Sequence, residues 1–170
     1  GVEDARLAVV VQRLVDAEAA GIMFTANPAN GRRDEVVINA SFGLGEAVVG
    51  GEVTPDELVV VGGEVISRTT ADKRVHTVRA DTGTHTEPLP PERREEQVLT
   101  DAQAVALADL GRRIQDHFGA PQDIEWVLAD GAFQVVQSRP VTALPEPVGP
   151  APTTWPLERL FHDRVLTTLS

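Results

Sequence analysis

The chain has 170 residues and a formal net charge of −11, and 42% of its residues are apolar. This length allows one domain with a core, and the acidic balance argues against a nucleic-acid-binding surface, which needs clustered basic residues. The apolar runs are too short to span a bilayer, so no membrane segment is expected. The absence of cysteine excludes disulfides and thiolate metal sites and favours a reducing, cytoplasmic compartment.

The first eighty residues have the pattern of strands separated by turns. β-Branched and apolar runs predict a buried strand at residues 7–12 and further strands at 21–25, 35–40, 58–61, 64–67 and 74–79. Gly62 and Gly63 lie between two of these strands and predict a hairpin turn. Residues 81–96 are polar and contain prolines, so a surface loop is expected there.

One long helix is expected to begin at Thr100. Thr100 and Gln103 have the spacing of a capping box, in which each side chain satisfies a backbone N–H near the start of the helix. Gly119 and Pro121 are typical of its end. The apolar face of this helix is expected to consist of Leu107, Leu110, Ile114 and Phe118. The fold class is therefore α+β, a mainly antiparallel sheet with packed helices.

The rest of the chain suggests a hairpin and then a linker. Residues 122–139 predict a second hairpin with Asp130-Gly131 at its tip. Several prolines follow, which indicates a stiff, extended linker at residues 145–156 after a domain at 1–144. Residues 157–170 are expected to begin a following segment or to form a tail, which could be a short amphipathic helix.

The second hairpin carries polar residues suited to a ligand. Gln137 and Arg139 stand two apart in an apolar strand, so alternation places both on one face, together with Val135. Glu125 is isolated between apolar residues in the partner strand. Carboxylate and amide oxygens suit Mg²⁺, and Arg can clamp phosphate oxygens. The alternative is a half-solvated hairpin with a surface Glu–Arg pair.

Two further segments allow two interpretations each. The glycine-rich residues 43–51 lack the spacing of a dinucleotide-binding fingerprint. They form either a turn into a short helix or a loop that lets the backbone approach a nucleotide. Gln12 either satisfies backbone groups or belongs to a hinge strand that reads the edge of a base. The histidines have no ligand spacing and are expected at the surface; they are His76, His85, His117 and His162.

Five segments occur together in a recognisable order. They are VVVQRLV (9–15), AGIMFTANP (20–28), INASFGLGE (38–46), DIEW (123–126) and QSRP (137–140). This series resembles the nucleotide-binding domain of the phosphoenolpyruvate synthase, pyruvate,phosphate dikinase and rifampicin phosphotransferase family, over about residues 7 to 144. The resemblance implies the C-terminal subdomain of an ATP-grasp domain, which forms half of an ATP cleft.

The resemblance also implies roles for matched positions. Adenine would be contacted by Gln12, Arg13, Leu14 and Val15, and Glu46 would lie near the ribose or adenine. Mg²⁺ would be coordinated by Glu125 and Gln137. Arg139 would hold the β/γ-phosphate region and serve catalysis. The family reaction splits ATP to AMP and phosphate. The β-phosphate passes through a histidine to an organic acceptor such as pyruvate or rifampicin.

The resemblance further implies partners that this chain does not contain. These are an N-terminal ATP-grasp subdomain with a phosphate-binding Lys and Arg, and a phosphohistidine domain. None of the four histidines has the surroundings of the phosphocarrier residue, so the isolated chain is expected to be inactive. Two alternatives stay open, a fragment of an ATP-grasp ligase and a non-catalytic remnant that binds no nucleotide.

A shared metal ion would constrain the geometry of the second hairpin. Glu125 and Gln137 must then project from the same face. A two-residue turn at 130–131 on a regular ladder would instead place Val136 opposite Glu125 and turn Gln137 away. We therefore expect a three-residue loop at 129–131, or an equivalent bulge.

Overall fold

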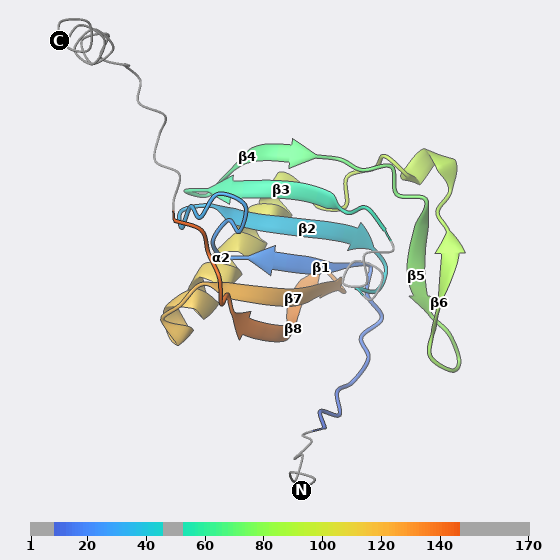
Figure 1. Cartoon of the computed structure of the whole chain (residues 1–170). Helices are drawn as coiled ribbons and strands as arrows, with labels where there is room; N and C mark the ends of the chain where they lie inside the picture. The colour runs from blue at the N-terminus through green and yellow to red at the C-terminus, as the bar shows by residue number, and fades with distance from the viewer. Residues whose placement is uncertain (1–8, 46–52, 147–170) are drawn as a thin grey trace, which may run out of the picture.

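The computed structural model describes residues 9–45 and 53–146. Six strands form one antiparallel sheet in the order β4-β3-β2-β1-β7-β8, and β5 and β6 form a separate two-stranded sheet. The strands are β1 (Ala19–Phe24), β2 (Val36–Phe42), β3 (Asp56–Val61), β4 (Glu64–Thr69), β5 (Val75–Arg79), β6 (Thr84–Pro88), β7 (Gln122–Ala129) and β8 (Ala132–Pro140). Helix α2 (Asp101–Phe118) crosses one face of the large sheet, and the short 3₁₀ helix η1 (Pro91–Arg93) precedes it (Figure 1). The fold is the α+β arrangement that the sequence predicts.

The hydrophobic core lies between α2 and the large sheet. Leu107 on the helix is fully buried, as are Ile38, Leu58 and Ile124 on the strands. Gly111 allows the helix to approach β1 closely, because a Cβ atom there would lie 2.6 Å from Cε of Met23. Burial of these side chains fixes which sheet face meets the helix and leaves the alternate residues of each strand on the opposite face.

Several local predictions are confirmed. The strands expected from residue 21 to residue 79 are all present, with bounds shifted by a few residues. The capping box is complete, since Thr100 Oγ1 accepts from the Gln103 amide at 3.2 Å and Gln103 Oε1 accepts from the Thr100 amide at 2.9 Å. Gly119 ends the helix in the left-handed conformation at φ 70°. Local sequence chemistry is sufficient for these features.

The prediction of a buried strand at residues 7–12 is wrong for the part that the structure describes. Residues 9–12 have no regular secondary structure, and Val9, Val10 and Val11 are 82%, 84% and 96% exposed. A β-branched run forms a strand only where another strand supplies hydrogen bonds. The sheet pairs β1 with β2 and β7 and leaves these valines outside it.

Two other expectations need correction. The loop expected at 81–96 contains β6 and η1, because Gly83 closes a tight turn in which the Ala80 amide donates to its carbonyl at 3.0 Å. Strand β6 is mostly exposed, so it has no apolar alternation by which to recognise it. Phe118 is 59% exposed rather than part of the core face. The packed helix face ends at Ile114, one turn earlier, and helical spacing cannot show where the sheet stops covering it.

The β7–β8 hairpin confirms the bulge but not the three-residue loop. Its turn has two residues, Asp130 and Gly131, at φ 51° and 70°, and Ala129 pairs with Ala132. The prediction of an odd loop at 129–131 is therefore wrong. Further from the turn, the register shifts between Glu125 and Trp126, which is the equivalent bulge.

The bulge decides which β8 side chains share a face. Trp126 pairs with Val135, whereas Glu125 pairs with Gln137, so Val136 is the extra residue. Directly opposed residues project from the same face. Gln137 therefore lies on the face of Glu125, as the metal hypothesis requires, and Val135 lies on the other face, contrary to the expectation that it would share the face of Gln137.

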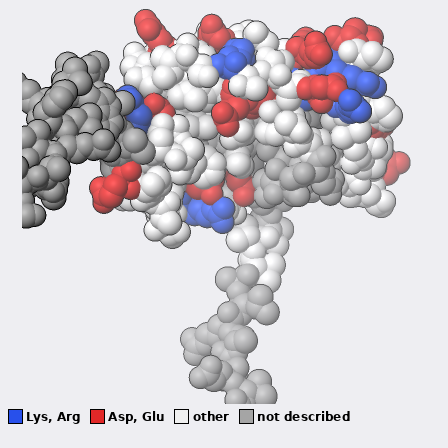
Figure 2. Space-filling model, turned by 45° about the horizontal axis from the view of Figure 1, so that its top comes forward, with Lys and Arg blue, Asp and Glu red and all other residues white. Residues whose placement is uncertain are grey.

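Some predictions concern parts of the chain that the structure does not describe. Glu46, the linker from residue 147 onward and the tail at 157–170 lie outside the described residues. No helix within the described ranges is long and apolar enough to cross a membrane. On the face drawn in Figure 2, acidic and basic side chains lie interspersed in small groups.

Candidate functional site

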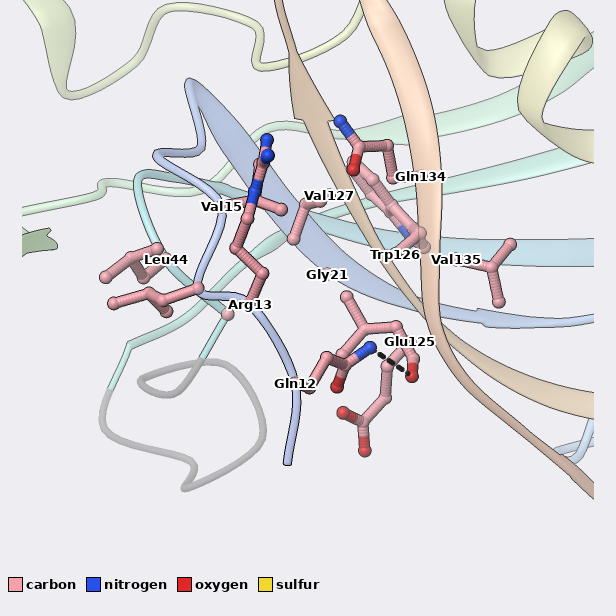
Figure 3. Close-up of a pocket in the computed structure, with 13 residues that line it drawn as sticks. Gln12, Arg13, Val15, Gly21, Leu44, Glu125, Trp126, Val127, Gln134 and Val135 are labelled. Carbon is pink, nitrogen blue, oxygen red and sulfur yellow. Dashed lines mark hydrogen bonds between the residues drawn. The ribbon is translucent and has the colours of Figure 1, made fainter. Parts of the chain in front are cut away.

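A pocket of about 730 Å³ lies where three predicted segments meet. It is bordered by the hinge segment (residues 12–15), the start of the glycine-rich segment and the β7–β8 hairpin (Figure 3). Its lining consists of Gln12, Arg13, Leu14, Val15, Gly21, Leu44, Gly45, Glu125, Trp126, Val127, Gln134, Val135 and Val136. A mainly apolar pocket of this size with a few polar side chains suits a small organic ligand.

The hinge segment borders the pocket without belonging to the sheet. All four of its residues line the cavity. The Gln12 side chain donates through Nε2 to the carbonyl oxygen of Val136 at 3.3 Å, as the dashed line in Figure 3 shows. Val136 is the extra residue of the bulge, so the irregularity in β8 also presents a carbonyl to the hinge. The role of this segment toward adenine stays a prediction.

The start of the glycine-rich segment forms another wall. Gly43 has φ 76°, and its amide donates to the Glu18 carbonyl at 3.0 Å. The Leu44 amide donates to the Thr77 carbonyl at 2.8 Å. Leu44 and Gly45 then line the pocket, and the role of this segment toward a nucleotide stays a prediction. Glu46, the predicted ribose-side residue, lies outside the described residues.

Glu125 and Gln137 make up the candidate metal pair. They are directly opposed across β7 and β8, and Glu125 also lines the pocket. No group of three or more His, Asp or Glu within residues 9–45 and 53–146 has a metal-binding arrangement. One carboxylate and one amide oxygen nonetheless fit Mg²⁺, which usually takes one or two protein ligands and fills its other positions with water and substrate phosphate.

Arg139 lies next along the same face and is held by Asp123. The two residues are directly opposed. Asp123 Oδ2 accepts from Arg139 Nε at 2.8 Å and forms an ion pair with Nη2 at 2.7 Å. The hydrogen bond that Arg139 donates to Asp123, followed by the charge of that carboxylate, raises the pKa of Arg139 above its ordinary value. Arg139 is mostly exposed, so it is a fixed cation facing solvent beside the Glu125–Gln137 pair.

Sequence reasoning missed Asp123 and several residues of the pocket wall. The surface pair on this hairpin is Asp123–Arg139 and not the Glu–Arg pair considered from spacing. A signal was available, because Asp123 stands two residues before Glu125 and alternation puts both on one face. Gly21 and Gln134 also line the pocket, and no local pattern distinguishes them from ordinary strand residues.

Comparison with known proteins shows the family of this chain. Residues 2–154 match the family described as "Pyruvate phosphate dikinase, AMP/ATP-binding domain". The chain belongs to this family. The matched range contains the hinge segment, the glycine-rich segment and the whole β7–β8 hairpin, so the resemblance stated from the five segments is confirmed.

Relatives in this AMP/ATP-binding family include enzymes with two different names. The chain is 54% identical over 140 residues to a rifampicin phosphotransferase from Streptomyces sp, which covers 81% of this chain and 16% of the relative. It is 49% identical over 151 residues to the phosphoenolpyruvate synthase of Pyrococcus furiosus, covering 82% and 18%. A probable phosphoenolpyruvate synthase from Methanothermobacter thermautotrophicus is 49% identical over 142 residues, covering 82% and 21%. The chain thus spans about a fifth of the length of these curated relatives.

Proposed function

We propose that this chain is the ATP·Mg²⁺-binding module of a dikinase-type phosphotransferase. The observation that carries the proposal is the β7–β8 register, in which a bulge sets Gln137 opposite Glu125 at the border of the pocket. The adenine base would lie between the hinge segment and Leu44. The phosphates would extend toward Glu125, Gln137 and Arg139. Membership of an AMP/ATP-binding family supports the binding of ATP.

The chemistry expected of this face is positioning and neutralisation of charge. Bound Mg²⁺, held by Glu125 and Gln137, would neutralise charge on the phosphate oxygens. Arg139 would hold the β/γ-phosphate region, and its pair with Asp123 keeps the guanidinium charged and oriented. Phosphoryl transfer requires little covalent chemistry from the protein, so catalysis rests mainly on such preorganised groups.

The finer proposal concerns the longer protein. ATP would be split to AMP and phosphate, and the β-phosphate would pass through a phosphohistidine domain to an organic acceptor such as pyruvate or rifampicin. The names of the relatives support both acceptors. An N-terminal ATP-grasp subdomain would complete the cleft and could cover the exposed Val9, Val10 and Val11. Residues 1–144 would form the domain part and 145–156 the linker.

Calorimetric titration with ATP, with and without Mg²⁺, tests the proposal. The wild-type chain should bind ATP more tightly when Mg²⁺ is present. Glu125→Ala and Gln137→Ala should lose most of that Mg²⁺-dependent gain, because each removes one oxygen ligand. Glu57→Ala is the matched control, since it removes the same charge as Glu125→Ala from an exposed position on β3 and should leave binding unchanged.

The outcomes separate the alternatives. Absence of ATP binding by both the wild-type chain and the longer protein would refute the proposal and indicate a non-catalytic remnant. Equal effects of Glu125→Ala and Glu57→Ala would remove Glu125 from the metal site. In the longer protein, release of ADP instead of AMP and phosphate would favour the ATP-grasp ligase, because acyl-phosphate chemistry transfers the terminal phosphoryl group.

A further inference from the structure

The two-stranded β5–β6 sheet stands beside the large sheet (Figure 1). We call residues 75–88 the β5–β6 arm. Strand β6 is mostly exposed, and β5 has one buried residue, Thr77, which is 5% exposed. No residue of the arm lines the 730 Å³ pocket. The function proposed above therefore assigns the arm no role.

The arm nevertheless contacts the wall of the pocket at Thr77. Gly43 and Thr77 form a parallel bridge, and the Leu44 amide donates to the Thr77 carbonyl at 2.8 Å. A Cβ atom on Gly43 would lie 2.2 Å from the Thr77 carbonyl oxygen. Gly43 also has φ 76°, so both the backbone conformation and the close approach require glycine here. Its own amide donates to Glu18 at 3.0 Å on the opposite side.

This contact determines where the next residues lie. Leu44 and Gly45 follow directly and line the pocket opposite the β7–β8 hairpin. Glu18, the other partner of Gly43, stands three residues after the hinge segment, and its amide donates to Leu128 of β7 at 2.9 Å. The Gly43 backbone is thus held between the arm and the chain that leads from the hinge into β1. A shift at Gly43 would move the Leu44 wall relative to the hinge.

We propose that the β5–β6 arm is a positioning element of the nucleotide pocket and that it acts through the contact between Gly43 and Thr77. Gly43 is the positioning residue, since any side chain there would push the pocket wall away from the arm. This inference rests on the proposed function, because it assumes that the pocket takes the adenosine part of the nucleotide.

Two alanine variants isolate the contact. Gly43→Ala and Gly83→Ala place a side chain at nearly the same backbone angle, φ 76° and φ 79°, and therefore incur similar backbone strain. A Cβ atom on Gly83 meets nothing within 4 Å, and Gly83 lies at the far turn of the arm. The two variants differ in the collision with Thr77 and in its effect on the pocket wall.

The measurement is the affinity of each variant for ATP, AMP and adenosine by calorimetry. Gly43→Ala should lower the affinity for each of the three ligands by about tenfold relative to Gly83→Ala. A change of this size is expected for the loss of one hydrogen bond in the wall of the pocket. The loss of affinity should be equal for ATP, AMP and adenosine, because in the proposed placement the Leu44 wall contacts the base and not the phosphates. Affinities within about twofold of Gly83→Ala would overturn the inference while leaving the proposed function intact. Failure of both the wild-type chain and the longer protein to bind ATP would overturn both the inference and the proposed function.

Amide hydrogen exchange in the wild-type chain decides the question if Gly43→Ala does not fold. Saturating ATP should slow exchange of the Leu44 amide, which donates to Thr77. The Ala80 amide is the internal control, because it donates to Gly83 within the arm and should change little. Equal or absent slowing at the two amides would refute the coupling between arm and pocket.

Discussion

The buried ion pair between Asp56 and Lys73 gives the sharpest test of what stabilises this fold. Both side chains have 0% exposure, and Lys73 Nζ lies 2.5 Å from Asp56 Oδ1. The carboxylate also accepts from the Ala71 amide at 2.9 Å and the Val98 amide at 3.0 Å. Asp56 thereby joins the start of β3 to the chain before the β5–β6 arm and to the chain before α2. We predict that Lys73→Met strongly destabilises the protein.

The size of the destabilisation by Lys73→Met follows from the negative charge that remains on Asp56. Methionine has a similar volume, so the effect of a cavity should be small. Asp56 keeps its two backbone donors but becomes a buried carboxylate without a cation. Removing one partner of a buried pair costs about 3–5 kcal/mol, against a total unfolding free energy of about 5–15 kcal/mol for a typical domain. Adding Asp56→Asn should recover part of the loss, because it removes the uncompensated charge.

Urea denaturation of the three proteins measures these differences, with Arg74→Met as the matched control. Arg74 is the next residue and pairs with Asp72 at 2.8 Å, but that pair is 75% and 44% exposed. The control should therefore change stability by less than about 1 kcal/mol. A similarly small effect of Lys73→Met would refute the argument, as would a double variant less stable than Lys73→Met alone.

Three further predictions concern the site and the helix. In the longer protein, Arg139→Ala should raise the activation free energy by about 3 kcal/mol through loss of a phosphate contact, and the fold should be retained. A kcat/KM of this variant equal to that of the wild type would remove Arg139 from the site. The isolated chain should show no steady release of AMP and phosphate, because the subdomain and histidine domain implied by the resemblance are missing, so sustained turnover in a phosphate-release assay would contradict the domain assignment. Thr100→Ala should cost about 1 kcal/mol by removing the helix cap, and an unchanged thermal midpoint would show that the capping box is not stabilising.

Local patterns were sufficient for much of the fold. The capping box at Thr100 and the turn at Gly62-Gly63 depend on neighbours in sequence, so they could be predicted. Asp130-Gly131 also gave the position of the second turn, although the loop length expected there was wrong. The metal hypothesis went one step further. Parity along β7 and β8 showed that a regular two-residue hairpin would separate Glu125 from Gln137, and the structure contains the bulge that resolves this conflict.

Other features depended on segments far apart in the sequence. The valines at 9–11 have strand-forming side chains but no strand beside them in the described residues. The strand predicted from their pattern is therefore absent from residues 9–12. The polar strand β6 forms because it pairs with β5. Its sequence has no alternation of apolar and polar residues that would predict a strand. In both cases the decisive factor is a hydrogen-bonding partner, which residue type alone cannot supply.

The sequence by itself determined the family, the order of the motifs and the residue types at the site. The tertiary structure decided how they meet. It placed the bulge at Val136, paired Arg139 with Asp123 and set Gly43 against Thr77. Each of these contacts joins residues that are at least nine positions apart. Spacing rules describe a helix or strand over a few residues, whereas register and close approach are set by the packing of the whole sheet.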